Sequence, residues 1–279
     1  MRITVLGSGT STGIPLVACS CPVCQSTNPY NKRYRSSVLI ETNDGTCILI
    51  DTTPDLRTQA LNAKMTKVHT VLYTHTHADH ILGIDDLRAF NFAMKRPIPI
   101  YANQQSSDYI KKSFSYTLKE LVNYPGGAPP KLLLNTIEPY EPISIRNENS
   151  NKEHKVIPLL AFHGQLEVLG YRIHNFAYIT DCSRIPDKTI SMLNNLDCLI
   201  LDGLRERPHK THLTLSQAIK IMEIVKPKKG YLTHISHETD HDEGNELIKN
   251  STPLNIELAF DGLVIDLYTQ PHSFLQKNE

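Results

Sequence analysis

Short apolar runs that end in polar residues dominate the pattern of hydrophobic and polar positions along this chain. Runs of this length, bounded by turn residues, are typical of β-strands. The ranges that fit this description are 3–6, 37–42, 47–51, 68–73, 98–101, 156–162, 178–181, 198–202, 231–234 and 258–265. Residues 43–46 contain a glycine between two of these runs and predict a hairpin turn, and the last range is expected to close in a hairpin of its own.

Helical spacing fills several intervals between these strands. Pro54 can begin a helix over residues 55–63, because proline is tolerated in the first helical turn. The apolar residues of 81–88 recur at helical spacing, and residues 107–121 fit an amphipathic helix. Many strands with interspersed helices and no internal repeat predict the α/β fold class.

A capping box gives the clearest helix start in the chain. Thr214 is followed three positions later by Gln217, which predicts a helix that runs to about Val225 and is ended by Gly230. The segment 103–153 is the least readable part of the sequence. Beyond the helix predicted over 107–121, its composition predicts a loop around the two adjacent prolines and a polar hairpin tip near its end.

One strand runs directly into a stretch that is dense in metal-capable side chains: His75, His77, Asp79 and His80. Because side chains alternate along a strand, His75 and His77 are expected on the same side, with Asp79 and His80 following where the chain turns into a helix. Imidazole and carboxylate suit divalent Zn, Mn or Fe. The stretch therefore predicts half of a binuclear metal site, and the alternative is a surface turn rich in histidine.

Further strands also end in metal-capable residues, namely His163, Asp181 and His234. Each of these alone is explained by an ordinary hydrogen-bonded side chain at a strand end. Loops at one edge of a sheet, however, are where a scaffold gathers functional groups from distant parts of a chain. We therefore expect these three residues to complete the site begun at His75.

Three cysteines form the cluster Cys19-x-Cys21-x-x-Cys24. The first residues lack the charged region and apolar core of a secretion signal, and no apolar run approaches about 18 residues. We therefore expect a soluble, cytoplasmic protein, in which such a cluster argues for metal before disulfide. The remaining cysteines lie in or beside apolar runs and are expected to be small core residues: Cys47, Cys182 and Cys198.

Length and charge narrow the classes of function. The chain has 279 residues and no marked boundary, so we expect a single domain over residues 1–279. Lys plus Arg and Asp plus Glu both number 29, which gives a formal charge of zero and a pI near 7.2. This balance disfavours a binder of long nucleic acid and fits a small anionic substrate. The glycine-rich loop 7–13 could cradle a phosphate, but no helix follows it, so a tight turn over the site entrance is favoured.

The set His75-x-His77-x-Asp79-His80 with His163, Asp181 and His234 resembles the ligand set of the metallo-β-lactamase superfamily, in its phosphodiesterase-like branch. The cysteine cluster combined with His234-x-x-His237 is similar to the phosphoribosyl 1,2-cyclic phosphate phosphodiesterases of phosphonate breakdown. The resemblance covers nearly the whole chain, and the middle segment is the poorest fit. It implies the αβ/βα sandwich of that superfamily, with two mixed sheets flanked by helices.

The resemblance also implies roles for individual residues. One metal ion would be held by His75, His77 and His163, the other by Asp79, His80 and His234, and Asp181 would bridge the two. A structural zinc would be held by Cys19, Cys21, Cys24 and His237, a closed Cys3His set that leaves no position for water. His212 matches the position of the non-ligand catalytic histidine and is expected to act as general acid or transition-state hydrogen-bond donor, with His209 as the fallback. Asp79 is the second residue expected in catalysis.

The implied cofactors are two divalent ions, Zn or Mn with Fe or Ni left open, and one structural Zn. The implied reaction is hydrolysis of a small cyclic phosphodiester, 5-phospho-α-D-ribose 1,2-cyclic phosphate, by a water that the two ions share. No membrane partner is expected, and a homodimer is left open. The rival interpretations are a tRNA 3′-end-processing nuclease, a pyrroloquinoline-quinone biosynthesis protein of the B type and a non-catalytic metal-binding module. The histidines without a motif are expected to be solvated or in the core: His69, His154, His174, His241 and His272.

Overall fold

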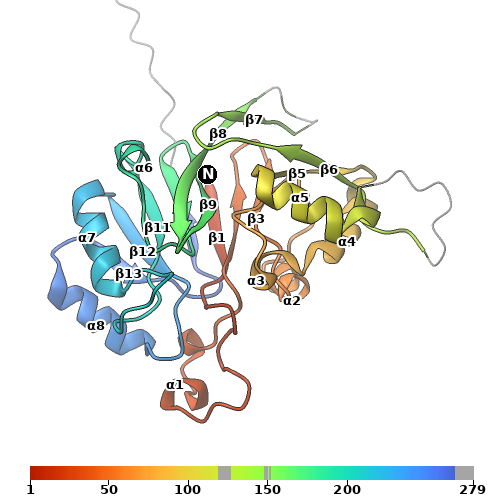
Figure 1. Cartoon of the computed structure of the whole chain (residues 1–279). Coiled ribbons are helices and arrows are strands. Elements are labelled where there is room, and N and C mark those ends of the chain that lie inside the picture. Colours follow the sequence, from red (N-terminus) through yellow and green to blue (C-terminus); the bar gives the residue numbers. More distant parts are fainter. Residues whose placement is uncertain (119–126, 148–149, 151, 268–279) are drawn as a thin grey trace, which may run out of the picture.

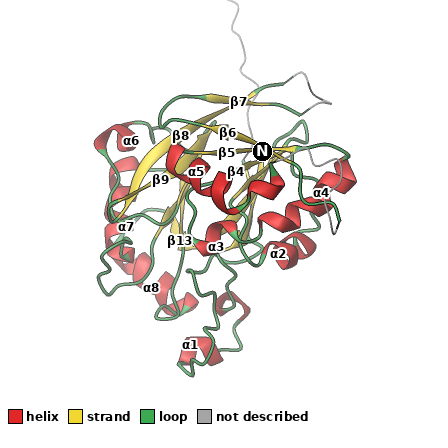
Figure 2. Ribbon diagram, turned by 45° about the vertical axis from the view of Figure 1, so that its right-hand side comes forward, coloured by secondary structure: helices red, strands yellow, loops and turns green. Residues whose placement is uncertain are grey.

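The computed structural model describes residues 1–118, 127–147, 150 and 152–267. The described strands form two mixed β-sheets that pack face to face, and helices cover the outer face of each sheet (Figures 1 and 2). This is the arrangement of two mixed sheets flanked by helices, so the predicted fold class is confirmed. Among the described residues, no helix is both long enough and apolar enough to cross a membrane.

The first sheet has the strand order β14-β1-β2-β3-β4-β5-β6. Its strands are β1 (Arg2–Gly7), β2 (Ser37–Glu41), β3 (Cys47–Ile50), β4 (Thr70–Leu72), β5 (Ile98–Ala102), β6 (Leu132–Thr136) and β14 (Val264–Asp266). Strands β3 to β6 pair in parallel, which requires crossover connections. These connections contain the helices α2 (Leu56–Asn62), α3 (Ala78–Ile81), α4 (Leu87–Met94) and α5 (Gln104–Ser113).

The second sheet has the strand order β13-β12-β11-β10-β9-β8-β7. Its strands are β7 (Ile143–Ile145), β8 (His154–His163), β9 (Leu166–Ile173), β10 (Phe176–Ile179), β11 (Cys198–Asp202), β12 (Lys229–Thr233) and β13 (Ile256–Leu258). The helices on its outer side are α6 (Asp187–Ser191), α7 (Leu215–Val225) and α8 (His241–Ser251) (Figure 1). The predicted capping box of α7 is present, because Thr214 and Gln217 exchange both hydrogen bonds.

Three apolar layers hold the sandwich together. Ile40 and Ile48 of the first sheet meet Tyr171 and Ile200 of the second in a central layer that is fully shielded from solvent. One further apolar layer lies between the second sheet and its helices, and another lies between the first sheet and its helices. Since most strands are therefore buried on both faces, they read in the sequence as continuous apolar runs rather than as alternating patterns.

Two hydrogen bonds join the sheets at the edge where β4 ends. The Tyr171 hydroxyl of β9 donates to the Tyr73 carbonyl at 2.6 Å, and the Leu169 N–H of β9 donates to the Thr74 carbonyl at 2.9 Å. Tyr171 is completely buried, so its hydroxyl needs a protein partner. These contacts fix the second sheet against the segment that leads into His75.

The N-terminal segment packs along the same edge. The Thr10 N–H donates to the Ile235 carbonyl at 3.0 Å, so the glycine-rich loop lies beside the residue that follows His234. The loop turns between Thr10 and Gly13, and no helix follows it directly. The chain then forms α1 (Pro22–Gln25) in a segment that projects from the lower end of the sandwich in Figure 1.

Three local predictions are wrong. The range 258–265 is not a hairpin, because β13 pairs with β12 in one sheet whereas β14 pairs with β1 in the other. Helix α7 ends at Lys226 in the left-handed conformation, and Gly230 instead lies in β12, where a Cβ atom would overlap the Met222 sulfur. The helix predicted over 107–121 begins earlier and ends at Ser113, and residues 119–126 lie outside the described residues.

We expect Tyr171→Phe to lower the free energy of unfolding by about 1–2 kcal/mol, because the buried Tyr73 carbonyl would lose its side-chain donor. Urea unfolding of the metal-free protein measures the change. Tyr101→Phe is the matched control, since no described residue hydrogen-bonds its hydroxyl, and this change should cost less than about 0.5 kcal/mol. Equal stability of the two variants would contradict the assignment of this link between the sheets.

Candidate metal centre and active site

The seven predicted ligands of the binuclear site converge at one edge of the sandwich, although they come from distant segments. Their positions are the loop after β4 for His75 and His77, helix α3 for Asp79 and His80, the end of β8 for His163, and the residues just after β10 and β12 for Asp181 and His234. The prediction that His75 and His77 share a strand face is wrong, because β4 ends at Leu72. The loop nevertheless brings the two rings together, with centroids 4.5 Å apart.

Asp181 lies at the centre of this cluster. Its Oδ1 is 3.3 Å from His80 Nε2, and its Oδ2 is 3.3 Å from His234 Nε2 and 3.9 Å from His75 Nε2. Only 2% of the residue is exposed. One carboxylate is thus within reach of histidines from three different segments, which is the arrangement that a bridging ligand requires.

Three groups of potential ligand atoms meet at Asp181. In the first group, potential ligand atoms lie within 4.8 Å of one another in Asp79, His80, Asp181 and His234. The second group joins Asp181 to His75 and His77. His163 groups with Asp181 and His212, and its ring centroid is 5.1 Å from that of His77. The structure therefore brings potential ligand atoms of all seven side chains together around Asp181.

Several of these polar atoms are buried without a hydrogen-bond partner among the described residues: His75 Nε2, His80 Nε2, His234 Nε2 and Asp79 Oδ2. A buried polar atom left unpaired costs about 1–3 kcal/mol, so such a concentration demands an explanation. Neutral imidazole nitrogens and carboxylate oxygens are the donors that divalent transition metals take. The donor set fits two divalent ions.

The electrostatics of the cluster keep its carboxylates ionised. Burial alone would raise the pKa of Asp181, but His234 and His80 hold it well below its usual value. Burial works against a charged His80, yet Asp181 and Asp79 raise the pKa of this ring well above the usual value. Burial, together with the charge on His80, lowers the pKa of His75. The neighbouring imidazoles of His234 and His80 thus favour the ionised form of the Asp181 carboxylate against the effect of burial.

The backbone is left-handed at three residues of this edge. The φ angles are 63° at Asp51, 51° at Asp181 and 62° at His234. Non-glycine residues rarely adopt this conformation, which costs of order 1–3 kcal/mol each and persists only where the surrounding fold imposes it. Here it turns the chain sharply after each strand, so the side chain that follows the strand is directed to the site.

Asp51 is a site residue that sequence reasoning treated only as the end of a strand. It is completely buried, and its carboxylate accepts the Thr74 N–H and hydroxyl, both at 2.8 Å, and His80 Nδ1–H at 2.7 Å. This contact fixes the tautomer of His80 and directs its Nε2 toward Asp181. The sequence signal was present, since Asp51 ends an apolar run just as Asp181 and Asp202 do.

Asp202 has the same relation to His212. The His212 Nδ1–H donates to Asp202 Oδ1 at 3.3 Å, and the Leu213 N–H donates to Oδ2 at 2.9 Å. The His212 ring stacks on that of His234 with centroids 4.6 Å apart, and it lies 4.6 Å from the His163 ring. His212 is thus held beside the cluster, whereas His209 is exposed and its ring centroid lies 5.1 Å from that of His212.

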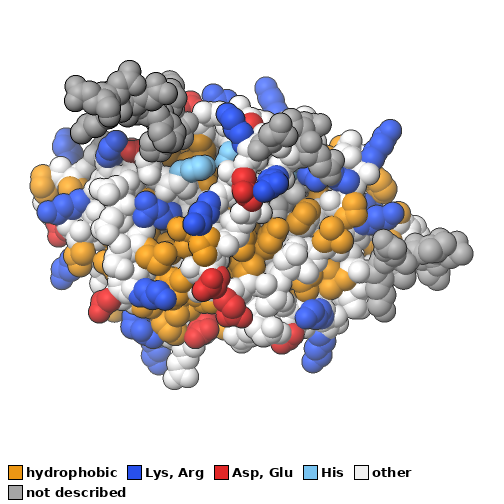
Figure 3. All heavy atoms as spheres, turned by 90° about the horizontal axis from the view of Figure 1, so that it is seen from above, with side chains coloured by type: hydrophobic (Ala, Val, Ile, Leu, Met, Phe, Trp, Pro, Cys, Tyr) orange, Lys and Arg blue, Asp and Glu red, His pale blue; other side chains and the backbone are white. Residues whose placement is uncertain are grey.

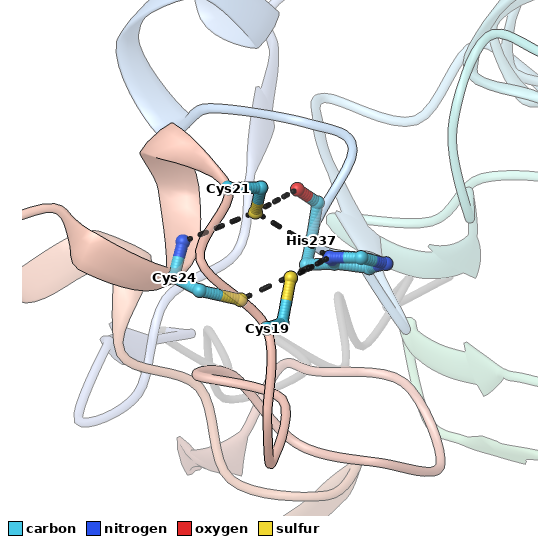
Figure 4. A group of neighbouring side chains, drawn as sticks. All are labelled: Cys19, Cys21, Cys24 and His237. Atoms are coloured by element: carbon cyan, nitrogen blue, oxygen red, sulfur yellow. Dashed lines mark hydrogen bonds between the residues drawn. The ribbon is translucent and has the colours of Figure 1, made fainter.

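Cys19, Cys21, Cys24 and His237 form a second cluster, shown in Figure 4. Their Sγ atoms lie 3.4, 3.5 and 3.8 Å from His237 Nδ1, in that order. Tetrahedral Zn with Zn–S of about 2.3 Å and Zn–N of about 2.0 Å separates its S and N ligands by about 3.5 Å. The Cys24 N–H, at the start of α1, helps to lower the pKa of Cys21 to about 6, which favours the thiolate. The geometry and the chemistry of this set fit one zinc ion.

Outside the two clusters, most of the described histidines and cysteines are buried in the packing of the chain. His69 Nδ1 accepts the Cys47 N–H at 2.9 Å, His154 contacts Asp44 at 2.9 Å, and His241 packs on Tyr30. His174 is exposed, and His272 lies outside the described residues. The cysteines predicted to lie in the core are all buried: Cys47, Cys182 and Cys198.

A family profile described as the β-lactamase superfamily domain matches residues 46–235. The chain is 41% identical to a crystal structure described as a new diphosphatase from the PhnP family, with a TM-score of 0.83 over 95% of this chain and 97% of that one. It is also 38% identical to a protein named octanoyltransferase from Porphyromonas gingivalis strain W83, over 94% of this chain. The chain spans 51% of that curated relative, about half its length.

More distant structures share the fold alone. Zn²⁺-bound PqqB from Methylobacterium extorquens is 18% identical, with a TM-score of 0.78 over 96% of this chain and all of PqqB. The short form of human tRNase Z is 20% identical, with a TM-score of 0.66 over 96% of this chain and all of that one. The chemistry of the site therefore has to be inferred from its residues, because structural similarity at this level of sequence identity does not show which reaction a protein catalyses.

We expect Asp51→Asn to weaken divalent metal binding by about 10- to 100-fold, since the amide cannot accept all three hydrogen bonds that orient Thr74 and His80. Chelator competition with Zn²⁺ measures the affinity. Asp108→Asn, which removes an exposed carboxylate on α5, is the control and should leave the affinity unchanged. Unaltered affinity in Asp51→Asn would show that His80 needs no such support.

Proposed function

The chain belongs to the β-lactamase superfamily, and from that premise we propose that it is a binuclear metal-dependent phosphodiesterase acting on a small phosphodiester. The proposal treats residues 1–279 as one hydrolase domain. The observation that carries it is the convergence of His75, His80 and His234 on the single buried carboxylate of Asp181. The similarity to a diphosphatase of the PhnP family supports the same class of phosphoryl chemistry.

The chain's residues divide into two ligand sets. His75, His77 and His163 would hold one ion, and Asp181 would be shared. Asp79, His80 and His234 would hold the other ion. Two divalent ions, Zn or Mn with Fe or Ni as alternatives, would lower the pKa of a shared water and offset the charge that builds on the phosphate.

His212 is proposed as the general acid. Asp202 holds its Nδ1–H, which leaves Nε2 available to give a proton to the leaving oxygen, and its stacking on His234 keeps the ring beside the cluster. Positioned proton transfer of this kind contributes about 10²- to 10⁴-fold to rate. Asp79 would take part by holding the ion that His80 and His234 also hold, and its Oδ2 lies 3.7 Å from His234 Nε2.

A small substrate fits this chain better than a polymer. By resemblance, the proposed substrate is 5-phospho-α-D-ribose 1,2-cyclic phosphate. A tRNA-processing nuclease is disfavoured, because the formal charge of the chain is zero. On the upper face of the molecule, Lys and Arg side chains lie among acidic and apolar ones (Figure 3). The PqqB-like alternative rests on 18% identity. Hydrolysis of a diphosphate linkage is a second candidate, which the 41% identical structure favours.

Cys19, Cys21, Cys24 and His237 are proposed to hold a structural zinc. His237 follows His234 by three residues, so the zinc would join the projecting N-terminal segment to the rim of the active site.

We expect metal-dependent hydrolysis of bis(4-nitrophenyl) phosphate, reduced about 100-fold or more by His77→Ala, because a metal ligand is lost. Absorbance of released 4-nitrophenolate measures the rate. His174→Ala removes an exposed histidine outside the cluster and should retain activity within about twofold. Equal turnover in His77→Ala would refute the enzyme proposal in favour of a non-catalytic metal-binding module. Cleavage of precursor tRNA would favour the nuclease instead.

Protein purified without added metal should contain about three ions per chain, and Cys21→Ser should lose roughly one of them. Elemental analysis by mass spectrometry measures the content. Cys47→Ala, at a buried cysteine outside the cluster, is the control and should keep all three. Full metal content in Cys21→Ser would count against the structural zinc.

A further inference from the structure

The loop between β11 and α7, residues 203–213, carries His212 and closes on itself at its base. Leu204 N–H donates to the Leu213 carbonyl at 3.0 Å, and Leu215 N–H donates to the Arg205 carbonyl at 3.1 Å. The loop also reaches a second site histidine, because its Thr211 carbonyl accepts His163 Nδ1–H at 2.8 Å. The position of this loop therefore sets the orientation of both His212 and His163.

Glu238 holds this loop from outside. Its carboxylate accepts Arg205 Nη1 and is also bound by Arg207, with Nη2 at 2.8 Å and Nε at 3.2 Å. Both arginines belong to the loop, and the Arg205 side chain is only 14% exposed. The Arg207 side chain is 67% exposed, but one carboxylate that binds two guanidinium groups, one of them through two nitrogens, gives a contact with defined geometry.

The segment that carries Glu238 is itself fixed on both sides. Ser236 N–H donates to the Leu204 carbonyl at 2.9 Å, and Arg33, of which 2% is exposed, donates to the carbonyls of Ser236 and Thr239 at 3.3 and 3.0 Å. This segment follows His234 and contains His237. Glu238 thus connects a rigid segment at the metal cluster to the loop that presents the general acid.

We propose that Glu238 is a positioning residue: by binding Arg205 and Arg207 it holds loop 203–213 so that His212 reaches the leaving oxygen. The inference rests on the proposed function for the role of His212. Glu238 touches neither the metal ligand atoms nor, by this proposal, the substrate. Its main effect should therefore be on proton transfer by His212, because His212 belongs to the loop whereas His163 contacts it through the Thr211 carbonyl.

Leaving-group dependence separates this role from a merely structural one. Phenolate is more basic than 4-nitrophenolate and depends more on a proton from the acid. Glu238→Gln should therefore lower kcat about tenfold with diphenyl phosphate and less than about twofold with bis(4-nitrophenyl) phosphate. In the His212→Ala background, the same change should have no further effect within about twofold. The double substitution Arg205→Gln and Arg207→Gln should reproduce the pattern from the other side of the contact.

Glu257→Gln is the matched control, because Glu257 forms an ion pair with Lys229 at 2.8 Å on strands β12 and β13. It should leave both rates unchanged. Equal losses with both esters, an undiminished loss in the His212→Ala background, or loss of bound metal in Glu238→Gln would overturn the proposal.

Hydrogen exchange followed by mass spectrometry tests the inference without any activity. Peptides that cover residues 203–213 should exchange faster in Glu238→Gln than in the native protein, and peptides of the central strands should not change. Unchanged exchange in residues 203–213 would overturn the positioning role even if the protein hydrolyses both esters. Absence of turnover in the native protein together with faster loop exchange would refute the general-acid role, and with it the proposal.

Discussion

A buried negative charge at Asp181 is the constraint on which the site depends. The carboxylate lies at the edge between two sheets, and nitrogens of His75, His80 and His234 surround it within 3.9 Å. A charge removed from water in this way is tolerated only beside positive charge, whether imidazolium or metal. The two sheets must therefore meet in one register, because His75 and His80 come from the first sheet and Asp181 and His234 from the second. The contacts of β9 with Tyr73 and Thr74 maintain that register.

A second set of buried carboxylates supports the first. Asp51 follows β3 and orients His80, and Asp202 ends β11 and orients His212. Each carboxylate accepts the Nδ1–H of its histidine with one oxygen and a backbone N–H with the other, which fixes the orientation of the ring. Preorganised donors of this kind are what a low-dielectric active site uses to stabilise charge in a transition state. The cost is left-handed backbone at Asp51, Asp181 and His234, which the surrounding strands impose.

The fold by itself is shared with proteins of different activity, so the site carries the functional argument. Similarity at 18–20% identity to PqqB and to a tRNase Z shows only that the sandwich is common to them. The relative named octanoyltransferase is about twice as long as the region that this chain matches, so its name is not carried over to this chain. For this chain the proposed function rests on the two clusters of potential ligands, on the placement of His212 and on the contacts of loop 203–213.

The sequence alone was enough to predict the features that depend on residue type and on short spacing. These are the fold class, the ligand-rich stretch from His75 to His80, the polar residues at strand ends, and the capping box of α7. Such features can be predicted without knowing which residues are in contact in the folded chain. The tertiary structure decided what depends on distant partners. It separated 258–265 between two sheets, ended β4 before His75, and gave Asp51 and Asp202 their histidines. Those outcomes require two segments to meet in space, and the hydrophobic pattern of each segment carries no information about its partner.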